Sequence, residues 1–325
     1  MKAVTHEAFG EPSQVLEVTE LPLPEPGPGQ VRIRTLLAAI HHHDLWTVRG
    51  TYGVKPELPA RAGTEAVGII DALGDDVRGF EVGQRVATGG TFGAWAEQFL
   101  AKAGALIPVP DDLPDQTAAQ LVSMPFSAIT LVDFLGAGPG EWVVQNAANG
   151  AVGRMVAQLA GARGINVIGL VRRAAGIGEL ADQGVDHVVA TDGDGWRDRV
   201  DELTGGAPIV AGVDSVGGRA SGDVLSLLTD GGTLVAFGAM DSPTMQISSG
   251  DVIFKQAVVK GFWGSKVSAA MSAEQRRALF AELVERIATG ALTLPVDAIY
   301  PFSEIRTAAA KSLEPGRRGK VLLRP

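Results

Sequence analysis

The chain has 325 residues, no Cys and a formal net charge of −9 at pH 7, with 46% hydrophobic and 20% charged residues. This composition is typical of a globular protein, and the length favours two domains. The absence of Cys excludes disulfides, thiolate metal sites and a Cys nucleophile. The acidic charge argues against a nucleic-acid partner. The sequence contains no run of 18 apolar residues, so we expect no membrane span. Residues 1–7 lack a signal-peptide core, and we therefore expect a cytoplasmic protein.

The first 120 residues contain short strand-like segments separated by Gly, Pro and Asp. Residues 31–35 alternate apolar and polar side chains, which is the pattern of a half-buried strand. They follow a Pro- and Gly-rich stretch at 22–29 that excludes a helix or a central strand. Further strands are expected at 66–72, 85–88 and 95–100. The sequence therefore predicts a β-rich, barrel-like domain over residues 1–122.

From about residue 120 onward, apolar strands alternate with helical segments, which indicates βαβ units and a parallel sheet. The expected strands are 142–145, 166–171, 187–190, 209–213, 233–237 and 258–262. Six such strands are typical of a doubly wound dinucleotide-binding sheet, which we assign to residues 123–263. A helix is expected at 272–289 with Ser272 as its N-cap, followed by strands at 292–300 and 320–323. We expect residues 264–325 to complete the first domain.

A glycine-containing loop follows the first strand of the alternating region. Residues 148–153 read A-x-G-x-x-G, a variant of the dinucleotide-binding pattern G-x-G-x-x-G, and they open an amphipathic helix. Gly150 would let the backbone approach a pyrophosphate, and Gly153 would allow close packing of the helix on the strand. The alternative is a merely structural tight turn. The predicted cofactor-binding residues of this loop are Asn149, Gly150, Ala151, Val152 and Gly153.

Two adjacent arginines follow the next strand, about 20 residues beyond the loop. NAD-specific sites usually place an acid here to bind the ribose, whereas a basic residue suits the 2′-phosphate of NADP(H). Arg172 and Arg173 therefore predict NADP(H) as the cofactor. The alternative interpretation is a solvated basic start of a helix, although a helix N-terminus disfavours cations.

The densest group of possible metal ligands is His41-His42-His43-Asp44. A catalytic zinc site needs at least three protein ligands, and the sequence brings no further His into this region. We therefore predict no metal, and expect polar histidines that line a cleft.

Four segments carry a resemblance to a known family: 50–60 (GTYGVKPELPA), 145–149 (QNAAN), 253–255 (IFK) and 261–263 (GFW). With the motifs above, the whole chain resembles the zinc-independent branch of the medium-chain dehydrogenase/reductase superfamily. Within that branch it is most similar to the mitochondrial-type trans-2-enoyl thioester reductases, with quinone oxidoreductases also similar. The resemblance implies an α/β architecture, in which a Rossmann domain and a GroES-like barrel domain enclose the active site in their cleft.

The resemblance also implies roles for individual residues. The zinc-ligand positions of related alcohol dehydrogenases fall on His41, Thr64 and Met124, and two of these three cannot bind zinc. Tyr52 matches a tyrosine with a catalytic role, although it could instead be a loop aromatic that covers the cleft. The three histidines depart from the family's Asn-Pro-Ser, and since histidine titrates near pH 6.5, His43 is a second candidate proton donor.

By position in the superfamily, later loops at the carboxyl ends of strands would also contact the cofactor. These residues are Phe237, Gly238, Phe262 and Trp263, each of which could equally be core or turn. The implied function is NADPH-dependent hydride transfer to an activated C=C of a small molecule, foremost a 2-enoyl thioester. The alternatives are an NADPH:quinone or enone reductase and a non-catalytic NADPH-binding protein. The resemblance further implies a homodimer formed through the last strand of the Rossmann sheet.

Overall fold

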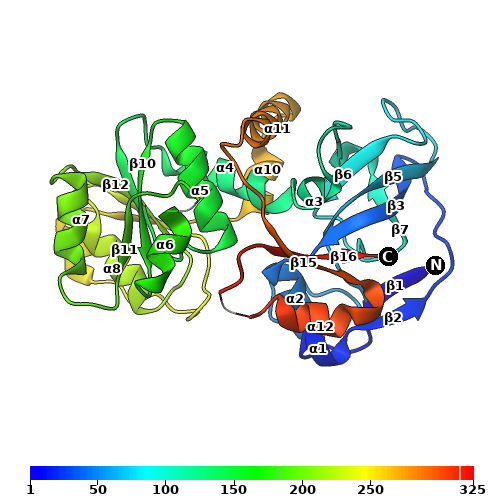
Figure 1. The fold of residues 1–325 in the computed structure, drawn as a ribbon, viewed down its shortest axis with the longest axis horizontal. Coiled ribbons are helices and arrows are strands. Elements are labelled where there is room, and N and C mark those ends of the chain that lie inside the picture. The colour runs from blue at the N-terminus through cyan, green and yellow to red at the C-terminus, as the bar shows by residue number, and fades with distance from the viewer. Residues whose placement is uncertain (182, 315) are drawn as a thin grey trace. The chain divides into compact units, whose positions relative to one another are not determined.

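The computed structural model describes residues 1–181, 183–314 and 316–325 (Figure 1). The chain forms two compact units. The first comprises Met1–Met124 and Leu294–Pro325, so that it holds both chain ends, and the second comprises Pro125–Thr293.

The first unit is built around a seven-stranded sheet in which β3 is the central element. The strand order is β15-β16-β3-β5-β6-β8, and β7 also pairs with β3. The strands are β3 (Gln30–Ala39), β5 (Glu65–Leu73), β6 (Arg85–Gly89), β7 (Gln98–Lys102), β8 (Leu106–Pro108), β15 (Val296–Pro301) and β16 (Lys320–Arg324). Strand β3 pairs antiparallel with β5, β7 and β16, so this unit is β-rich, as predicted.

Smaller elements complete this unit. A three-stranded sheet has the order β2-β1-β4. Its strands are β1 (Lys2–His6), β2 (Glu17–Glu20) and β4 (Ala60–Arg61), and the helices are α1 (Pro12–Val15), α2 (His42–Arg49), α3 (Asp115–Ala118) and α12 (Ile305–Lys311), with 3-10 turns η1 (Ala103–Ala105) and η2 (Phe302–Glu304). The predicted strand at 95–100 begins only at Gln98, because the backbone of Trp95 and Ala96 instead pairs with β1.

Trp95 anchors the core of the first unit. Its side chain is fully buried, and its indole N–H donates to the carbonyl of Ala39 over 3.0 Å. Gly63 makes room for it: a Cβ at this position would lie 2.2 Å from Cδ1 of Trp95, and its φ of +88° also requires glycine. This close approach fixes the backbone directly before Thr64.

The second unit contains six parallel strands in the order β11-β10-β9-β12-β13-β14. They are β9 (Trp142–Gln145), β10 (Asn166–Val171), β11 (Val188–Ala190), β12 (Ile209–Asp214), β13 (Thr233–Ala236) and β14 (Val258–Gly261). In chain order this is 3-2-1-4-5-6, the order of a dinucleotide-binding sheet, so the predicted Rossmann fold is confirmed. The direction of winding reverses beside β9, the strand that precedes the glycine loop.

Helices connect or flank these strands along the chain. They are α4 (Ser123–Leu135), which begins at the boundary of the units, α5 (Ala151–Ala162), α6 (Ala175–Ala181), α7 (Trp196–Thr204), α8 (Arg219–Leu227), α9 (Ser249–Phe254), α10 (Gly264–Ala270) and α11 (Ala273–Ala288). Ser272 is the N-cap of α11, as predicted, and accepts from the Gln275 N–H.

Residues 264–293 lie in the second unit, whereas the sequence assigned them to the first. The reason is the packing of α11. Phe280 stacks on Phe126 with ring centroids 4.6 Å apart, and Glu282 pairs with Arg163 over 2.8 Å. The return to the first unit therefore comes at Leu294, about 30 residues later than expected.

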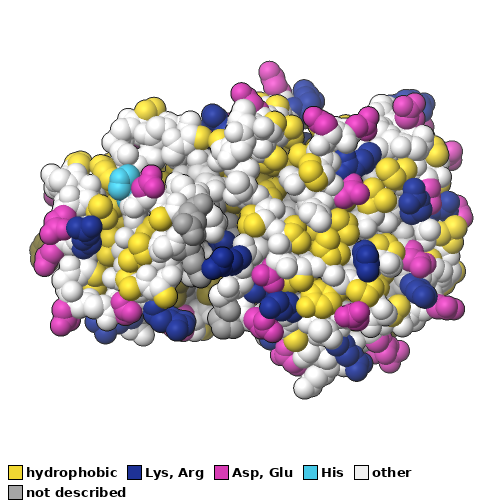
Figure 2. Space-filling view, in the orientation of Figure 1, with side chains coloured by type: hydrophobic (Ala, Val, Ile, Leu, Met, Phe, Trp, Pro, Cys, Tyr) yellow, Lys and Arg dark blue, Asp and Glu magenta, His cyan; other side chains and the backbone are white. Residues whose placement is uncertain are grey.

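Charges of both signs are interspersed over the face of the molecule in Figure 2. Within the described residues, no helix is both long and apolar enough to cross a membrane.

Candidate functional site

The predicted cofactor loop lies between β9 and α5 in the second unit. Helix α5 begins at Ala151, directly after its N-cap Gly150, and no side chain caps its first turn. The N–H groups of Ala151, Val152 and Gly153 therefore point out of the helix N-terminus without a side-chain cap, which is the arrangement that binds phosphate. Asn149 lies directly before the cap, so the structure brings the five predicted loop residues together.

Close packing holds this loop on the sheet. A Cβ at Gly153 would lie 2.7 Å from the Ala147 carbonyl oxygen, and Gln145 Nε2 donates to the Gly153 carbonyl over 2.7 Å. Gly153 therefore lets the first turn of α5 lie close to the loop backbone at Ala147 and Ala148. Gly169 in β10, which sequence reasoning missed, makes room for Ala148, because a Cβ there would lie 2.9 Å from Cβ of Ala148. A glycine inside an apolar strand was the signal available for it.

A buried polar network ties the loops after β9 and β12 together. Asn146 Nδ2 donates to Asp214 Oδ1 over 2.7 Å, and the Asn146 side-chain oxygen accepts from the Ser215 N–H over 2.7 Å. Asp214 also accepts from the N–H groups of Val216 and Gly217 and from the Ser221 hydroxyl. Sequence reasoning missed this network, which fixes two loops at the carboxyl edge of the sheet.

Arg172 and Arg173 lie at the same edge of the sheet as the loop. They directly follow the last residue of β10, which pairs parallel with β9, and both are exposed. Because the carboxyl ends of parallel strands lie together, this edge carries both the helix N-terminus and two exposed arginine residues. The arrangement suits a ligand with several phosphates.

The four later candidates follow β13 and β14 and differ in exposure. Phe262 is buried, and its ring lies 5.7 Å from that of Phe237. Trp263, by contrast, is 52% exposed. Gly238 lies close to the neighbouring loop, since a Cβ there would be 3.0 Å from the Ser215 carbonyl oxygen. The Phe262 side chain is therefore core, whereas Trp263 is open to a ligand.

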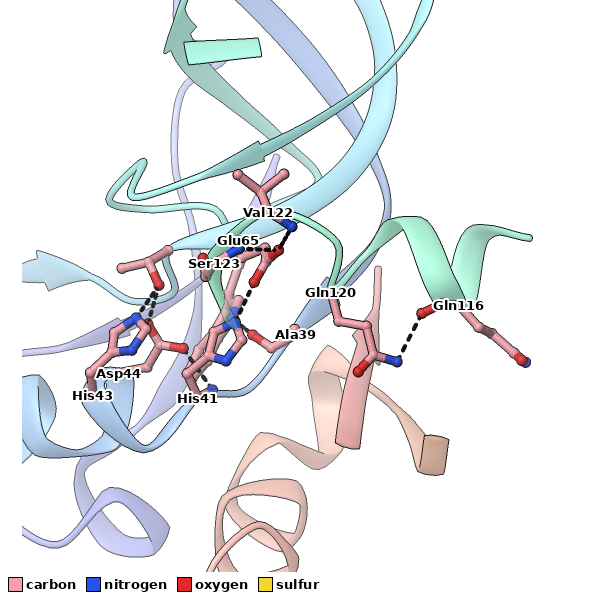
Figure 3. A network of polar contacts seen from close by, with 11 residues as sticks. Ala39, His41, His43, Asp44, Glu65, Gln116, Gln120, Val122 and Ser123 are labelled. Atoms are coloured by element: carbon pink, nitrogen blue, oxygen red, sulfur yellow. Dashed lines mark hydrogen bonds and ion pairs between the residues drawn. The ribbon is translucent and has the colours of Figure 1, made fainter. Parts of the chain in front are cut away.

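In the first unit, the histidine cluster forms the start of α2. Asp44 Oδ2 accepts from the backbone N–H of His41 over 2.9 Å and so closes the first turn. Asp44 Oδ1 accepts from the Thr64 hydroxyl over 2.6 Å, and Nε2 of His43 lies 2.7 Å from the same hydroxyl oxygen. Figure 3 shows the side chains of His43 and Asp44 next to each other. The cluster is thus one hydrogen-bonded chain that joins His43, Thr64 and Asp44.

A second buried chain starts from His41. Its Nε2 lies 2.5 Å from Glu65 Oε2, while Glu65 Oε1 accepts from the N–H groups of Val122 and Ser123 over 2.6 and 2.9 Å (Figure 3). Burial raises the pKa of Glu65 to about 7 and lowers the pKa of His41 well below its ordinary value. Burial also lowers the pKa of Lys320 to about 8. Sequence reasoning missed Glu65 and Lys320.

The structure brings the two predicted catalytic residues together. The rings of His43 and Tyr52 lie 5.8 Å apart, and His43 also stacks on His41 at 5.0 Å. Burial, followed by the charge of Asp44, raises the pKa of Tyr52, so that it stays a neutral phenol at neutral pH. His42 lies apart from this chain beside Trp46, and burial lowers its pKa to about 4.

These residues do not fit a zinc ion. Thr64 occupies a position that the resemblance gives to a zinc ligand, but its hydroxyl is engaged by Asp44 and His43. Nε2 of His41 is engaged by Glu65. In the part of the chain that the structure describes, no three His, Asp or Glu side chains are arranged to hold a metal ion.

Comparisons with known proteins agree with this architecture. A family model described as "Alcohol dehydrogenase GroES-like domain" matches residues 27–111, and one described as "Zinc-binding dehydrogenase" matches residues 151–285. The mitochondrial enoyl-[acyl-carrier-protein] reductase of Homo sapiens is 33% identical over 330 residues, covering 99% of this chain and 88% of the relative. That of Arabidopsis thaliana is 31% identical with the same coverages.

Solved structures are similar over the whole chain. A putative NADPH:quinone reductase from Bacillus thuringiensis has a TM-score of 0.91 at 26% identity, covering 100% of this chain and 98% of its own. A mycobacterial protein complexed with NADPH has a TM-score of 0.89 at 29% identity, with both chains fully covered. The resemblance inferred from sequence motifs is thereby confirmed, and the chain belongs to the medium-chain dehydrogenase/reductase superfamily.

Proposed function

We propose that the protein is an NADPH-dependent oxidoreductase that reduces an activated C=C bond, foremost that of a 2-enoyl thioester. The proposal rests on the pairing of Tyr52 with His43, whose rings lie 5.8 Å apart. They lie beside His41 and Thr64, which do not fit a zinc ion. The full-length relatives at 33% and 31% identity, both enoyl-[acyl-carrier-protein] reductases, support the same substrate class.

The second unit supplies the cofactor site. The N–H groups at the start of α5 would hold the pyrophosphate, and Arg172 and Arg173 would hold the 2′-phosphate. Trp263, which is half exposed at the carboxyl edge of the sheet, adds an aromatic surface. The NADPH found in the mycobacterial structure supports this assignment. When bound, NADPH supplies the hydride.

Tyr52 and His43 would manage charge and protons on the substrate. Reduction at the β-carbon of an enoyl thioester places negative charge on the thioester oxygen, which a neutral phenol stabilises as a hydrogen-bond donor. The raised pKa of Tyr52 keeps its proton in place for this purpose. His43 would deliver the proton that the α-carbon takes up.

A second candidate function is NADPH:quinone reductase. It is supported by the similarity to the Bacillus thuringiensis structure described as a putative NADPH:quinone reductase, at a TM-score of 0.91. A quinone needs the same hydride donor but no thioester, and Tyr52 would then be dispensable. A non-catalytic NADPH-binding protein is the third possibility.

One experiment separates the three. NADPH consumption is followed side by side with crotonyl-CoA, a short enone and a benzoquinone. Turnover of crotonyl-CoA well above the quinone supports the thioester reductase. Turnover with the quinone alone would sink that assignment, and NADPH binding without any turnover would favour the binding protein.

The expected homodimer belongs to the same proposal. Strand β14 is the last in the order of the parallel sheet, and its Val258 and Val259 are exposed. Ile253 and Phe254 in the preceding helix are 64% and 84% exposed. An uncovered strand edge beside exposed apolar side chains is typical of an interface, and a second copy of this chain would pair edge to edge. The cytoplasmic location stays a prediction.

A further inference from the structure

The Thr64 hydroxyl lies between a carboxylate and an imidazole, and both neighbours are within hydrogen-bond distance. Its oxygen is 2.6 Å from Asp44 Oδ1 and 2.7 Å from Nε2 of His43. Thr64 and Asp44 are buried at 4% and 2% exposure, whereas the His43 side chain is 20% exposed. His43 thus connects a fixed interior to an accessible surface.

The hydrogen bonds between Asp44, Thr64 and His43 allow only one placement of the protons. Asp44 accepts from the His41 N–H at Oδ2 and from the Thr64 hydroxyl at Oδ1. The single hydroxyl proton of Thr64 must therefore point at Asp44 Oδ1, which leaves its oxygen as the acceptor for His43. Nε2 of His43 then carries a proton in every state of the ring, and a second proton can be gained or lost only at Nδ1.

We propose that Thr64 and Asp44 are positioning residues that fix a proton on Nε2 of His43, so that Nδ1 is the atom that exchanges a proton with the substrate. The inference rests on the proposed function for its substrate, but the position of the proton is a property of the free protein. In this proposal Thr64 orients a general acid, whereas related alcohol dehydrogenases have a zinc ligand at this position.

The groups around His43 suit this arrangement. Asp44 Oδ1 lies 3.5 Å from Nε2. His41, stacked at 5.0 Å, stays neutral because burial and Lys320 lower its pKa, so it does not repel a proton on His43. Tyr52 is a neutral phenol, and Glu65 is bound to His41. The neighbouring His42 is also held neutral, chiefly by burial.

A small cavity beside these hydrogen-bonded residues decides which substitution of Thr64 is informative. The cavity, of about 10 Å³, is lined by Asp44 and Thr64 with His6, Thr47 and Gly63, and has room for about one water molecule. Thr64→Ala would enlarge it and admit a water that replaces the hydroxyl. Thr64→Val fills the same space without an acceptor, and Thr64→Ser keeps the acceptor.

The test measures the tautomer of His43 by ¹⁵N NMR of histidine-labelled protein, with the His43 signals assigned through His43→Asn. In the wild type and in Thr64→Ser, neutral His43 should show the proton on Nε2. In Thr64→Val, Nε2 loses its 2.7 Å acceptor and keeps only the longer 3.5 Å contact with Asp44 Oδ1, so the proton should shift in part toward the Nδ1 tautomer. The matched control is Thr35→Val, which removes another buried hydroxyl with a 2.6 Å hydrogen bond, to the Ala96 carbonyl, and should leave the His43 signals unchanged.

Kinetics with the best substrate give the second readout. We expect Thr64→Val to lower kcat by roughly 10- to 100-fold with little change in KM, and Thr64→Ser to restore most of it. An unchanged tautomer in Thr64→Val would overturn the inference whatever the activity. If no substrate is turned over, the proposed function fails, whereas the NMR result still decides the position of the proton.

Discussion

Nε2 of His41 and Oε2 of Glu65 lie 2.5 Å apart, and both side chains are buried. Burial disfavours the charged form of both side chains, so Glu65 and His41 stay close to neutral. The pKa of Glu65 is raised to about 7 and that of His41 is lowered, in each case chiefly by burial. A carboxyl group that is protonated on folding makes the stability of the protein depend on pH.

The first prediction concerns Glu65→Gln. Below about pH 7 the folded protein holds a proton on Glu65, whereas the unfolded chain does so only below about 4.5. Through this group the wild type therefore loses stability as the pH rises from 4.5 to 7. The variant lacks this loss, so its free energy of unfolding relative to the wild type should rise by as much as ~3 kcal/mol between pH 5 and pH 8.

Urea unfolding at the two pH values measures this difference. The lowered pKa of His41 has the opposite effect, a loss of stability as the pH falls below 6.5, but it is present in both proteins. The exposed Glu57→Gln serves as a control and should differ from the wild type by the same amount at both pH values. A relative stability of Glu65→Gln that falls as the pH rises would contradict the assignment.

The second prediction addresses the choice of cofactor. Replacing both Arg172 and Arg173 by Ala removes two exposed cations at the carboxyl edge of the sheet. We expect the Kd for NADPH to rise roughly 10- to 100-fold, with little change for NADH, because hydrogen bonds to charged groups contribute about 1.5–3 kcal/mol. Titration by nicotinamide fluorescence measures both constants. Arg199→Ala, on α7, is the control, and a double variant that still prefers NADPH would remove the 2′-phosphate assignment.

The third prediction concerns the backbone of the cofactor loop. In Gly153→Ala, the new Cβ would lie 2.7 Å from the Ala147 carbonyl oxygen, so the loop must move away from α5. We expect weaker binding of NADPH and NADH alike and a loss of about 1–3 kcal/mol in stability. Gly161→Ala, in the same helix with open space at its Cβ, should be neutral or stabilising. Equal cofactor affinity in both variants would show that the loop does not contact the cofactor.

The fourth prediction concerns Tyr52. If its phenol stabilises the thioester oxygen, Tyr52→Phe should lower kcat with crotonyl-CoA by about 10²-fold or more, while KM changes little. Tyr300→Phe removes the hydroxyl of the other tyrosine in the chain and is the matched control. An unchanged kcat for Tyr52→Phe on the best substrate would take this residue out of the chemistry and favour the quinone reductase.

The sequence predicted the second unit best, because its signals are local. The strands at 142–145 and 166–171 are built on short apolar runs at 142–144 and 167–171, and their predicted ends match β9 and β10. The glycine loop between β9 and α5 lies within the same short stretch. Residues 264–293 were misassigned because an amphipathic helix shows that it packs, but not against which sheet; the contact of Phe280 with Phe126 is not local.

Sequence patterns could not predict the hydrogen-bond networks of the first unit. Glu65 stands at the start of a strand, where an acidic residue normally indicates solvent, and the two N–H groups that it binds lie 57 and 58 residues away. Tyr52 and His43 were predicted as separate candidates, but only folding places their rings together. Thr64 was noticed as a missing zinc ligand, and its hydrogen bonds to Asp44 and His43 emerge only from the tertiary structure.

The last prediction tests the dimer. Phe254 is 84% exposed and precedes the terminal strand β14, so a second copy that pairs along this edge would bury it. Phe254→Glu places a charge in that contact and should raise the dimer Kd by about 100-fold or more, because an unpaired charge is costly to bury. Sedimentation across a range of micromolar concentrations measures the constant. Leu23→Glu alters a similarly apolar exposed side chain in the first unit and should leave the dimer intact. A wild type that is monomeric throughout would refute the dimer, and a variant that stays dimeric would exclude this edge as the interface.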